Sequence, residues 1–268
     1  MRPTPPRSRP KIVRELLLVI VLYGLYRLGR LAANGHVSEA FANAARVWSW
    51  ERTVHLPDEA SVQGLILHGR ALEKAANLYY SNVHFPAMIV FLVWMFWRHP
   101  THYVWVRRVL TALTGAGLAL HLAFPLAPPR MVPAFGLVDT GRLVGPSPYG
   151  DVDTQGLANQ FAAMPSLHVG WALVIAIGLI TVGRSRWRWL WLAHPAATLF
   201  VVVSTANHYW LDGIVAAALL GASLFLIPPR RRARLTDARL SKPHPPTAAR
   251  SARALPPLDP PMHTATGH

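Results

Sequence analysis

The amino-acid sequence predicts an all-α, polytopic membrane protein with about six transmembrane helices and an interfacial helix before the second of them. Of its 268 residues, 52% are hydrophobic and only 15% are charged. A soluble domain usually carries about 25% charged residues, so this composition argues against a soluble enzyme. The apolar residues also gather in stretches of roughly 20, the length at which a helix crosses a hydrocarbon core.

The predicted spans follow one another along the chain and are separated by polar or proline-rich segments. Five are clear apolar stretches, at residues 12–33, 106–126, 166–183, 188–206 and 210–228. The sixth, at 83–97, follows an amphipathic segment at 62–80, which we expect to lie in the membrane interface. The first stretch has no convincing cleavage site, which favours a retained helix over a signal peptide.

The composition also sets the predicted domain boundaries. Residues 1–10 and 229–268 are rich in proline and arginine and almost lack periodic apolar residues. Such segments cannot bury enough apolar surface to order themselves, so both are predicted to be disordered tails. Residues 11–228 are predicted to form one membrane-embedded domain.

Basic residues indicate how this domain is oriented. They concentrate in the tails and in the connections near Arg107 and Arg186, whereas the loops at 34–60 and 127–164 hold few of them. By the positive-inside rule, both termini are therefore cytoplasmic. The predicted localisation is the cell membrane, with multiple passes, and membrane lipids are expected partners.

The net charge of +15 raises the question of nucleic-acid binding. Many of the basic residues, however, lie in short runs beside apolar stretches, as topology determinants do. We therefore expect no nucleic-acid partner.

Neither a metal ion nor another cofactor is expected. The chain has no cysteine, and its 13 histidines form no HExxH pattern or similar ligand set. Asp151 and Asp153 lie in a proline- and glycine-rich loop, where acidic residues are usually solvated. His121, late in the third span, is expected to hydrogen-bond a neighbouring carbonyl rather than to react.

Three polar segments lie at ends of predicted spans, all on the face opposite the cytoplasm. They are residues 124–130, 162–172 and 204–213. His208 and Asp212 are four residues apart, so a helix would bring them within hydrogen-bonding reach. An aspartate beside a histidine fixes the tautomer of the imidazole and leaves its other nitrogen nucleophilic or basic.

The other two segments supply groups that bind phosphate. Ser166 and His168 stand at the predicted start of a span, where free backbone N–H groups and the helix dipole favour an anion. Arg130 carries a planar guanidinium suited to phosphate oxygens. Together with His208 and Asp212, these residues form a set of groups for phosphoryl transfer that needs no metal.

At these residues the sequence resembles the phosphatidic acid phosphatase type 2 superfamily, and within it the branch of inositol phosphorylceramide synthases. The resemblance covers roughly residues 80–228, and the motifs that carry it are PSLH, ending at His168, and HYWLD, from His208 to Asp212. It implies that His208 is the nucleophile that forms a phosphohistidine and that Asp212 orients it. It also implies that His168 is the general acid on the leaving oxygen and that Ser166 helps to bind phosphate.

The chain departs from the superfamily pattern at phosphate-binding positions. Arg130 matches the arginine of the first motif, but Ala123 and Met131 stand where a lysine and a proline are usual. Val202 stands where the third motif has an arginine. Candidate replacements for the missing cations, left unranked, are Asn159, Asn207, His84 and Arg142. Fewer cations also suit a phosphodiester better than a dianionic monoester.

The sequence thus predicts an integral membrane lipid-phosphate phosphatase or phosphotransferase, similar to an inositolphosphotransferase, with a phosphohistidine intermediate and a site at the outer face. Its substrate would be a phosphorylated lipid, and its acceptor either water or an alcohol. One alternative is a non-catalytic membrane scaffold or transporter, which would tolerate loss of His208. Another is a binder of nucleic acid or anionic lipid that acts through residues 230–268. The lipid, the acceptor and the oligomeric state are not predicted.

Overall fold

The computed structural model describes residues 36–144 and 161–229, with five single residues before them, Val13, Glu15, Leu17, Ile20 and Gly24. This described part is helical, without a strand and with one parallel bridge between Leu126 and Ala162. The predicted all-α class is therefore confirmed. The predicted tail at 1–10, nearly all of the tail at 229–268 and most of the first predicted span lie outside the described residues.

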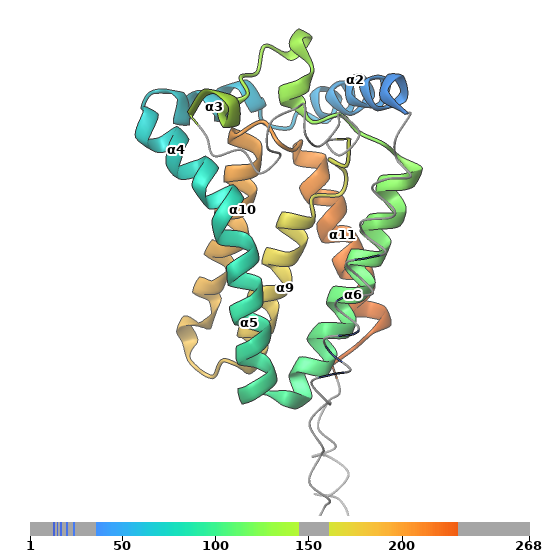
Figure 1. Cartoon of the computed structure of the whole chain (residues 1–268), viewed down its shortest axis with the longest axis vertical. Helices are drawn as coiled ribbons and strands as arrows, with labels where there is room; N and C mark the ends of the chain where they lie inside the picture. Colours follow the sequence, from blue (N-terminus) through green and yellow to red (C-terminus); the bar gives the residue numbers. More distant parts are fainter. Residues whose placement is uncertain are drawn as a thin grey trace, which may run out of the picture. The chain divides into compact units, whose positions relative to one another are not determined.

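Five helices pack side by side into the bundle that carries the candidate site (Figure 1). In chain order they are α5 (His84–Arg98), α6 (Pro100–Ala123), α9 (Leu167–Val182), α10 (Ala193–Ser204) and α11 (Trp210–Leu226). Helix α9 contacts the other four, so it is the centre of the bundle. Its glycines permit close approach: a Cβ built on Gly178 would lie 2.5 Å from Cζ of Phe91.

The ends of these helices differ from the predicted spans for local reasons. Helix α6 begins at Pro100, because proline at the first helical position lacks only an N–H that would be unpaired there anyway. It ends at Ala123, since Pro125 disfavours a helical conformation in the residue before it. The span predicted at 188–206 starts as a 3-10 helix, Arg186–Leu192, and becomes α-helical only at Ala193.

The longest apolar helix runs without a break from Arg70 to Arg98. It consists of α4 (Arg70–Leu78), a π-helical turn at Tyr79–Val83, and α5. By length and composition alone, it is the one helix in the described residues that is able to cross a membrane. Helices α9 and α11 are apolar but have 16 and 17 residues. Six crossings therefore stay a prediction.

The amphipathic segment at 62–80 differs from the single interfacial helix that the sequence predicts. It is divided at His68 and Gly69 between α3 (Glu59–Leu67) and α4. Asp58 caps α3 by accepting the N–H of Ser61. Helix α4 then continues through the π-helical turn into α5 instead of ending before it.

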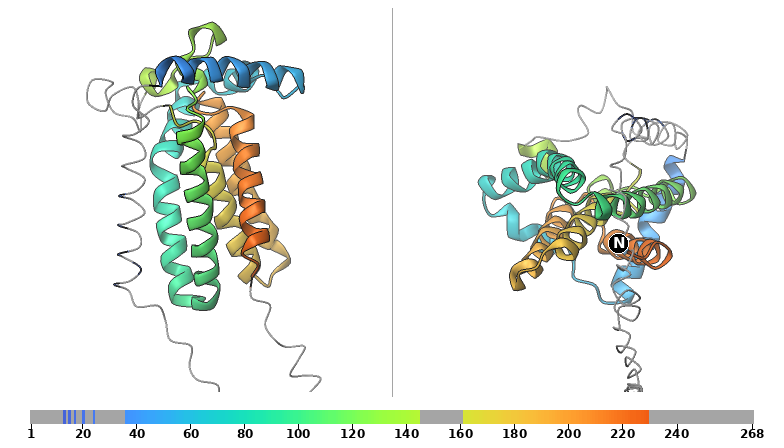
Figure 2. Two further views of the ribbon diagram at one scale, coloured as in Figure 1. Left: turned by 90° about the vertical axis from the view of Figure 1, so that its right-hand side faces the viewer. Right: turned by 90° about the horizontal axis from the view of Figure 1, so that it is seen from below.

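A layer of helices covers one end of the bundle. Helix α2 (Val37–Thr53) runs across this end (Figure 2). No helix is predicted within the loop at residues 34–60, where the structure has α2. The buried residues of α2 are Ala40, Asn43, Ala44, Val47 and Glu51, two of them polar and the others small, and so this face gives only a weak apolar pattern.

Candidate active site

The three polar segments that the sequence analysis singles out meet at the covered end of the bundle. Main-chain hydrogen bonds join them in pairs. The N–H of Arg130 donates to the carbonyl of Ala206, and the N–H of Ser166 donates to the carbonyl of Asp212, both at 3.0 Å. The side chains of the five predicted site residues therefore share one region of the fold.

His208 and Asp212 form a buried pair at the start of α11. Nδ1 of His208 lies 3.1 Å from Oδ2 of Asp212 and 2.9 Å from the carbonyl oxygen of Ala163. Both neighbours accept hydrogen bonds, so the neutral imidazole carries its proton on Nδ1 and keeps its lone pair on Nε2. The Asp212 carboxylate also accepts the N–H of Tyr209 at 2.9 Å, which fixes its orientation. His208 precedes α11 instead of lying on it, and the bond from the N–H of Tyr209 to the Asp212 carboxylate holds the pair together.

His168 faces this pair from the second residue of α9. Its ring centroid is 6.1 Å from that of His208, and the ring of Tyr80 stacks on it at 4.5 Å. Ser166 is fully buried and caps α9, because its Oγ accepts the N–H of Val169 at 3.5 Å. A contact between Ser166 and phosphate stays a prediction.

Arg130 is held beside the residue that precedes His208. One of its terminal nitrogens donates to Oδ1 of Asn207 at 2.7 Å, and its Nε lies 3.4 Å from the carboxylate of Asp139. Its main-chain partner Ala206 has a φ of 54°, a left-handed conformation that is uncommon for a residue with a side chain. Asn207 and Asp139 thus hold the guanidinium, and the main-chain bond to Ala206 holds its backbone, next to the residue that precedes His208.

The structure separates the four candidates for the missing cations. Asn207 positions Arg130, and His84 lies against His168 with 4.7 Å between ring centroids. Arg142 is exposed and pairs with Asp139 instead. Asn159 lies outside the described residues.

A comparison with protein-family models identifies the family. The model of the PAP2 superfamily matches residues 45–226, which is more than half of the chain. The chain belongs to the PAP2 superfamily. It is also 28% identical over 148 residues to the inositol phosphorylceramide synthase catalytic subunit aur1 of Schizosaccharomyces pombe, an alignment that covers 50% of this chain. The chain spans only 35% of the length of that relative, and no solved structure matches it.

Membership of the PAP2 superfamily confirms the resemblance drawn from the two histidine motifs. Among the described residues, no group of three or more His, Asp or Glu side chains is placed to hold a metal ion. His121 does what the sequence analysis expects, since its Nε2 lies 3.1 Å from the carbonyl oxygen of Pro165.

Two buried carboxyl groups support this PAP2 site and were missed by the sequence analysis. Oε1 of Glu51 accepts the N–H of Leu211 at 2.8 Å, one residue before Asp212. Glu59 lies beside Glu51, and both are fully buried. Burial and the hydrogen bond to Glu59 raise the pKa of Glu51 to about 9, so its carboxyl group is protonated at neutral pH. No local pattern reveals this contact, because Glu51 and Leu211 are 160 residues apart.

Proposed function

We propose that this protein is an integral membrane phosphatase or phosphotransferase that transfers a phosphoryl group from a lipid by way of a phosphohistidine at His208. The observation that carries the proposal is the buried pair of His208 and Asp212 with His168 beside it. A deprotonated Nε2 is the nucleophile that such chemistry needs, and Asp212 stabilises the positive charge that the imidazole acquires. No metal ion takes part in this proposal.

In the first step, the Nε2 lone pair of His208 forms a bond to phosphorus and the bond from phosphorus to the leaving oxygen breaks. His168 gives its proton to that oxygen, so the group departs as a neutral alcohol. Arg130 and the amides at the start of α9 hold the non-bridging oxygens, where negative charge is concentrated. Preorganised donors of this kind supply the largest share of the stabilisation in many enzymes.

In the second step, His168 works as a base. It takes the proton of the acceptor hydroxyl, the acceptor oxygen binds phosphorus, and the P–N bond breaks with its electron pair returning to His208. Water as acceptor makes the enzyme a phosphatase, and an alcohol makes it a phosphotransferase. The pairing of Arg130 with Asp139 lowers the net positive charge, which favours a singly charged phosphodiester as the donor.

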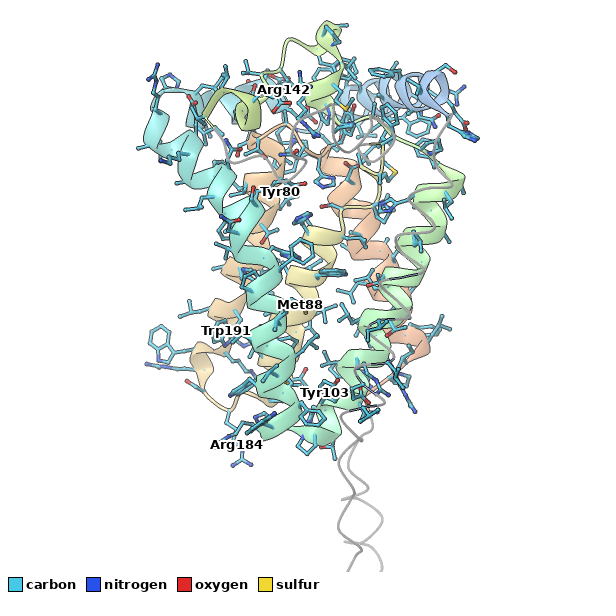
Figure 3. All side chains as sticks on the ribbon, in the orientation of Figure 1. Tyr80, Met88, Tyr103, Arg142, Arg184 and Trp191 are labelled. Carbon is cyan, nitrogen blue, oxygen red and sulfur yellow. The ribbon has the colours of Figure 1, made fainter. Side chains whose placement is uncertain are left out.

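The proposed setting is a membrane with about six crossings, both termini in the cytoplasm and the site at the outer face. The basic residues gathered at 98–108 and 184–188 support this orientation. Tyr80, which stacks on His168, and Arg142 lie toward the covered end, whereas Arg184 lies at the opposite end (Figure 3). Arginine at the end away from the site fits the positive-inside rule.

The test compares detergent-purified wild type with His208→Ala. The control is His102→Ala, a substitution in the first turn of α6. Both lipid phosphomonoesters and phosphodiesters are offered with EDTA present, and free phosphate and new phospholipids are followed. We expect turnover in wild type and in His102→Ala, and none in His208→Ala. Free phosphate as the product identifies a phosphatase, and a new ester that needs an added alcohol identifies a transferase. Turnover that survives in His208→Ala, or that EDTA abolishes, contradicts the proposal.

A further inference from the structure

His84 is a buried imidazole that the proposed mechanism does not use. The residue is only 1% exposed, and neither ring nitrogen has a hydrogen-bond partner. An unsatisfied buried donor or acceptor costs about 1–3 kcal/mol. Two such atoms on one side chain therefore suggest a partner that arrives with a ligand.

The position of His84 connects it with the proposed chemistry. It is the first residue of α5, directly after the π-helical turn Tyr79–Val83, and π-helical turns are frequent at functional sites. Its ring lies 4.7 Å from His168 and stacks on Trp171 at 5.7 Å with an interplanar angle of 18°. Tyr80 covers His168 as well. The two unpaired nitrogens are thus surrounded by aromatic rings next to the general acid.

We infer that His84 binds the acceptor alcohol, whose oxygen attacks the transferred phosphorus, and that it selects acceptors carrying a second hydroxyl group. The inference rests on the proposed function, in which His168 exchanges a proton with that oxygen. The carbon skeleton attached to the oxygen must then lie against His168, where His84 is a neighbour. A neutral imidazole offers one donor and one acceptor, and a hydroxyl group, which can both accept and donate, can pair with either of them.

The role assigned to His84 involves no change in its bonding or protonation. During transfer, the attacking hydroxyl loses its proton to His168, its oxygen binds phosphorus, and the bond from phosphorus to His208 breaks. His84 only hydrogen-bonds the second hydroxyl of the same alcohol. The rings of Tyr80 and Trp171 pack against the carbon atoms of the alcohol, as aromatic side chains do in many ligand sites.

The test measures how the phosphoenzyme divides its phosphoryl group among water, 1-butanol and glycerol. His84→Phe keeps the aromatic packing and removes both nitrogens. We expect transfer to glycerol to fall about tenfold or more, the effect of one lost hydrogen bond of about 1.4 kcal/mol. Transfer to water and to 1-butanol, and the yield of phosphoenzyme, should stay within about twofold of wild type. His84→Gln, which retains a donor and an acceptor, should recover part of the transfer to glycerol.

The matched control is His194→Phe. His194 is partly buried and, like His84, has an unpaired ring nitrogen, but its other nitrogen is 2.9 Å from the hydroxyl of Tyr79. The variant His194→Phe is expected to leave all three transfers unchanged. Three results would overturn the role of His84: unchanged transfer to glycerol in His84→Phe, an equal loss for all three acceptors, or a wild type that transfers only to water. A wild type that forms no phosphoenzyme overturns the proposed function itself, and the two failures are thereby told apart.

Discussion

Asn207 is predicted to act on the reaction only through Arg130, and its removal provides a quantitative test of the phosphate clamp. The Asn207 amide oxygen accepts a bond of 2.7 Å from the guanidinium, and its nitrogen donates to Oγ1 of Thr205 at 2.8 Å. Asn207→Ala removes this acceptor and leaves the guanidinium of Arg130 less firmly positioned. The variant should therefore weaken phosphate binding without altering the nucleophile.

The size of the effect follows from the contacts that survive. A hydrogen bond to a charged group contributes about 1.5–3 kcal/mol. Arg130 keeps its ion pair with Asp139 and its main-chain bond to Ala206, so we expect the lower part of this range, about 1.5–2 kcal/mol. Since 1.4 kcal/mol corresponds to a factor of ten, kcat/KM should fall roughly 10- to 30-fold. Steady-state assays measure this loss, with the lipid phosphate ester that wild type turns over in the assay of His208→Ala as the donor.

Asn43→Ala is the matched control. Like Asn207, Asn43 is buried and accepts a hydrogen bond from an arginine, Arg46, at 3.2 Å. Its nitrogen donates to the carbonyl of Pro125 at 2.9 Å, and it makes no contact with the guanidinium of Arg130 among the hydrogen bonds described above. Its removal should lower the melting temperature and leave kcat/KM within about threefold of wild type. The reasoning fails if Asn207→Ala keeps wild-type kcat/KM, or if Asn43→Ala loses as much of it.

Two further predictions concern stability. A methyl group at Gly178 would meet Phe91, so Gly178→Ala should lower the melting temperature through overpacking, which costs about 1–3 kcal/mol. Gly221→Ala has open space around its Cβ, so its melting temperature should match or exceed that of wild type. Equal melting temperatures of the two variants would contradict the packing argument. The pKa of Glu51 is raised to about 9 in the folded protein from an ordinary value of 4.5, so a rise in pH between these values favours the unfolded chain. Glu51→Gln keeps an acceptor for the N–H of Leu211 and places its own N–H toward Glu59. The melting temperature of this variant should therefore fall less than that of wild type between pH 5 and pH 9. Parallel pH profiles of the two melting temperatures would refute this.

The sequence was most informative where chemistry is encoded in short motifs. The spacing of His208 and Asp212 predicts their contact, and the structure places Nδ1 and Oδ2 at 3.1 Å. The resemblance to the PAP2 superfamily rests on the same residues and is confirmed by the family match. The all-α class follows from the apolar stretches, because each is long enough to form several helical turns.

The parts that escaped prediction depend on contacts between distant segments. The buried face of helix α2 combines small apolar residues with Asn43 and Glu51, so it shows no periodicity of large apolar side chains. Glu51 accepts a hydrogen bond from Leu211, which is 160 residues away in the sequence. The place of His84 beside His168 likewise depends on how α5 packs against α9, and so the sequence could name it only as one of four candidates.

The central claim is a covalent bond between phosphorus and His208. The most direct measurement mixes the enzyme with a lipid substrate carrying a labelled phosphoryl group, in EDTA, stops the reaction in alkali and locates the label by mass spectrometry. We predict a phosphoryl group that is labile in acid and stable in base, on the peptide that contains His208, and no such label in His208→Ala. A label on another residue, a label that persists in His208→Ala, or turnover without any labelled protein would contradict the mechanism.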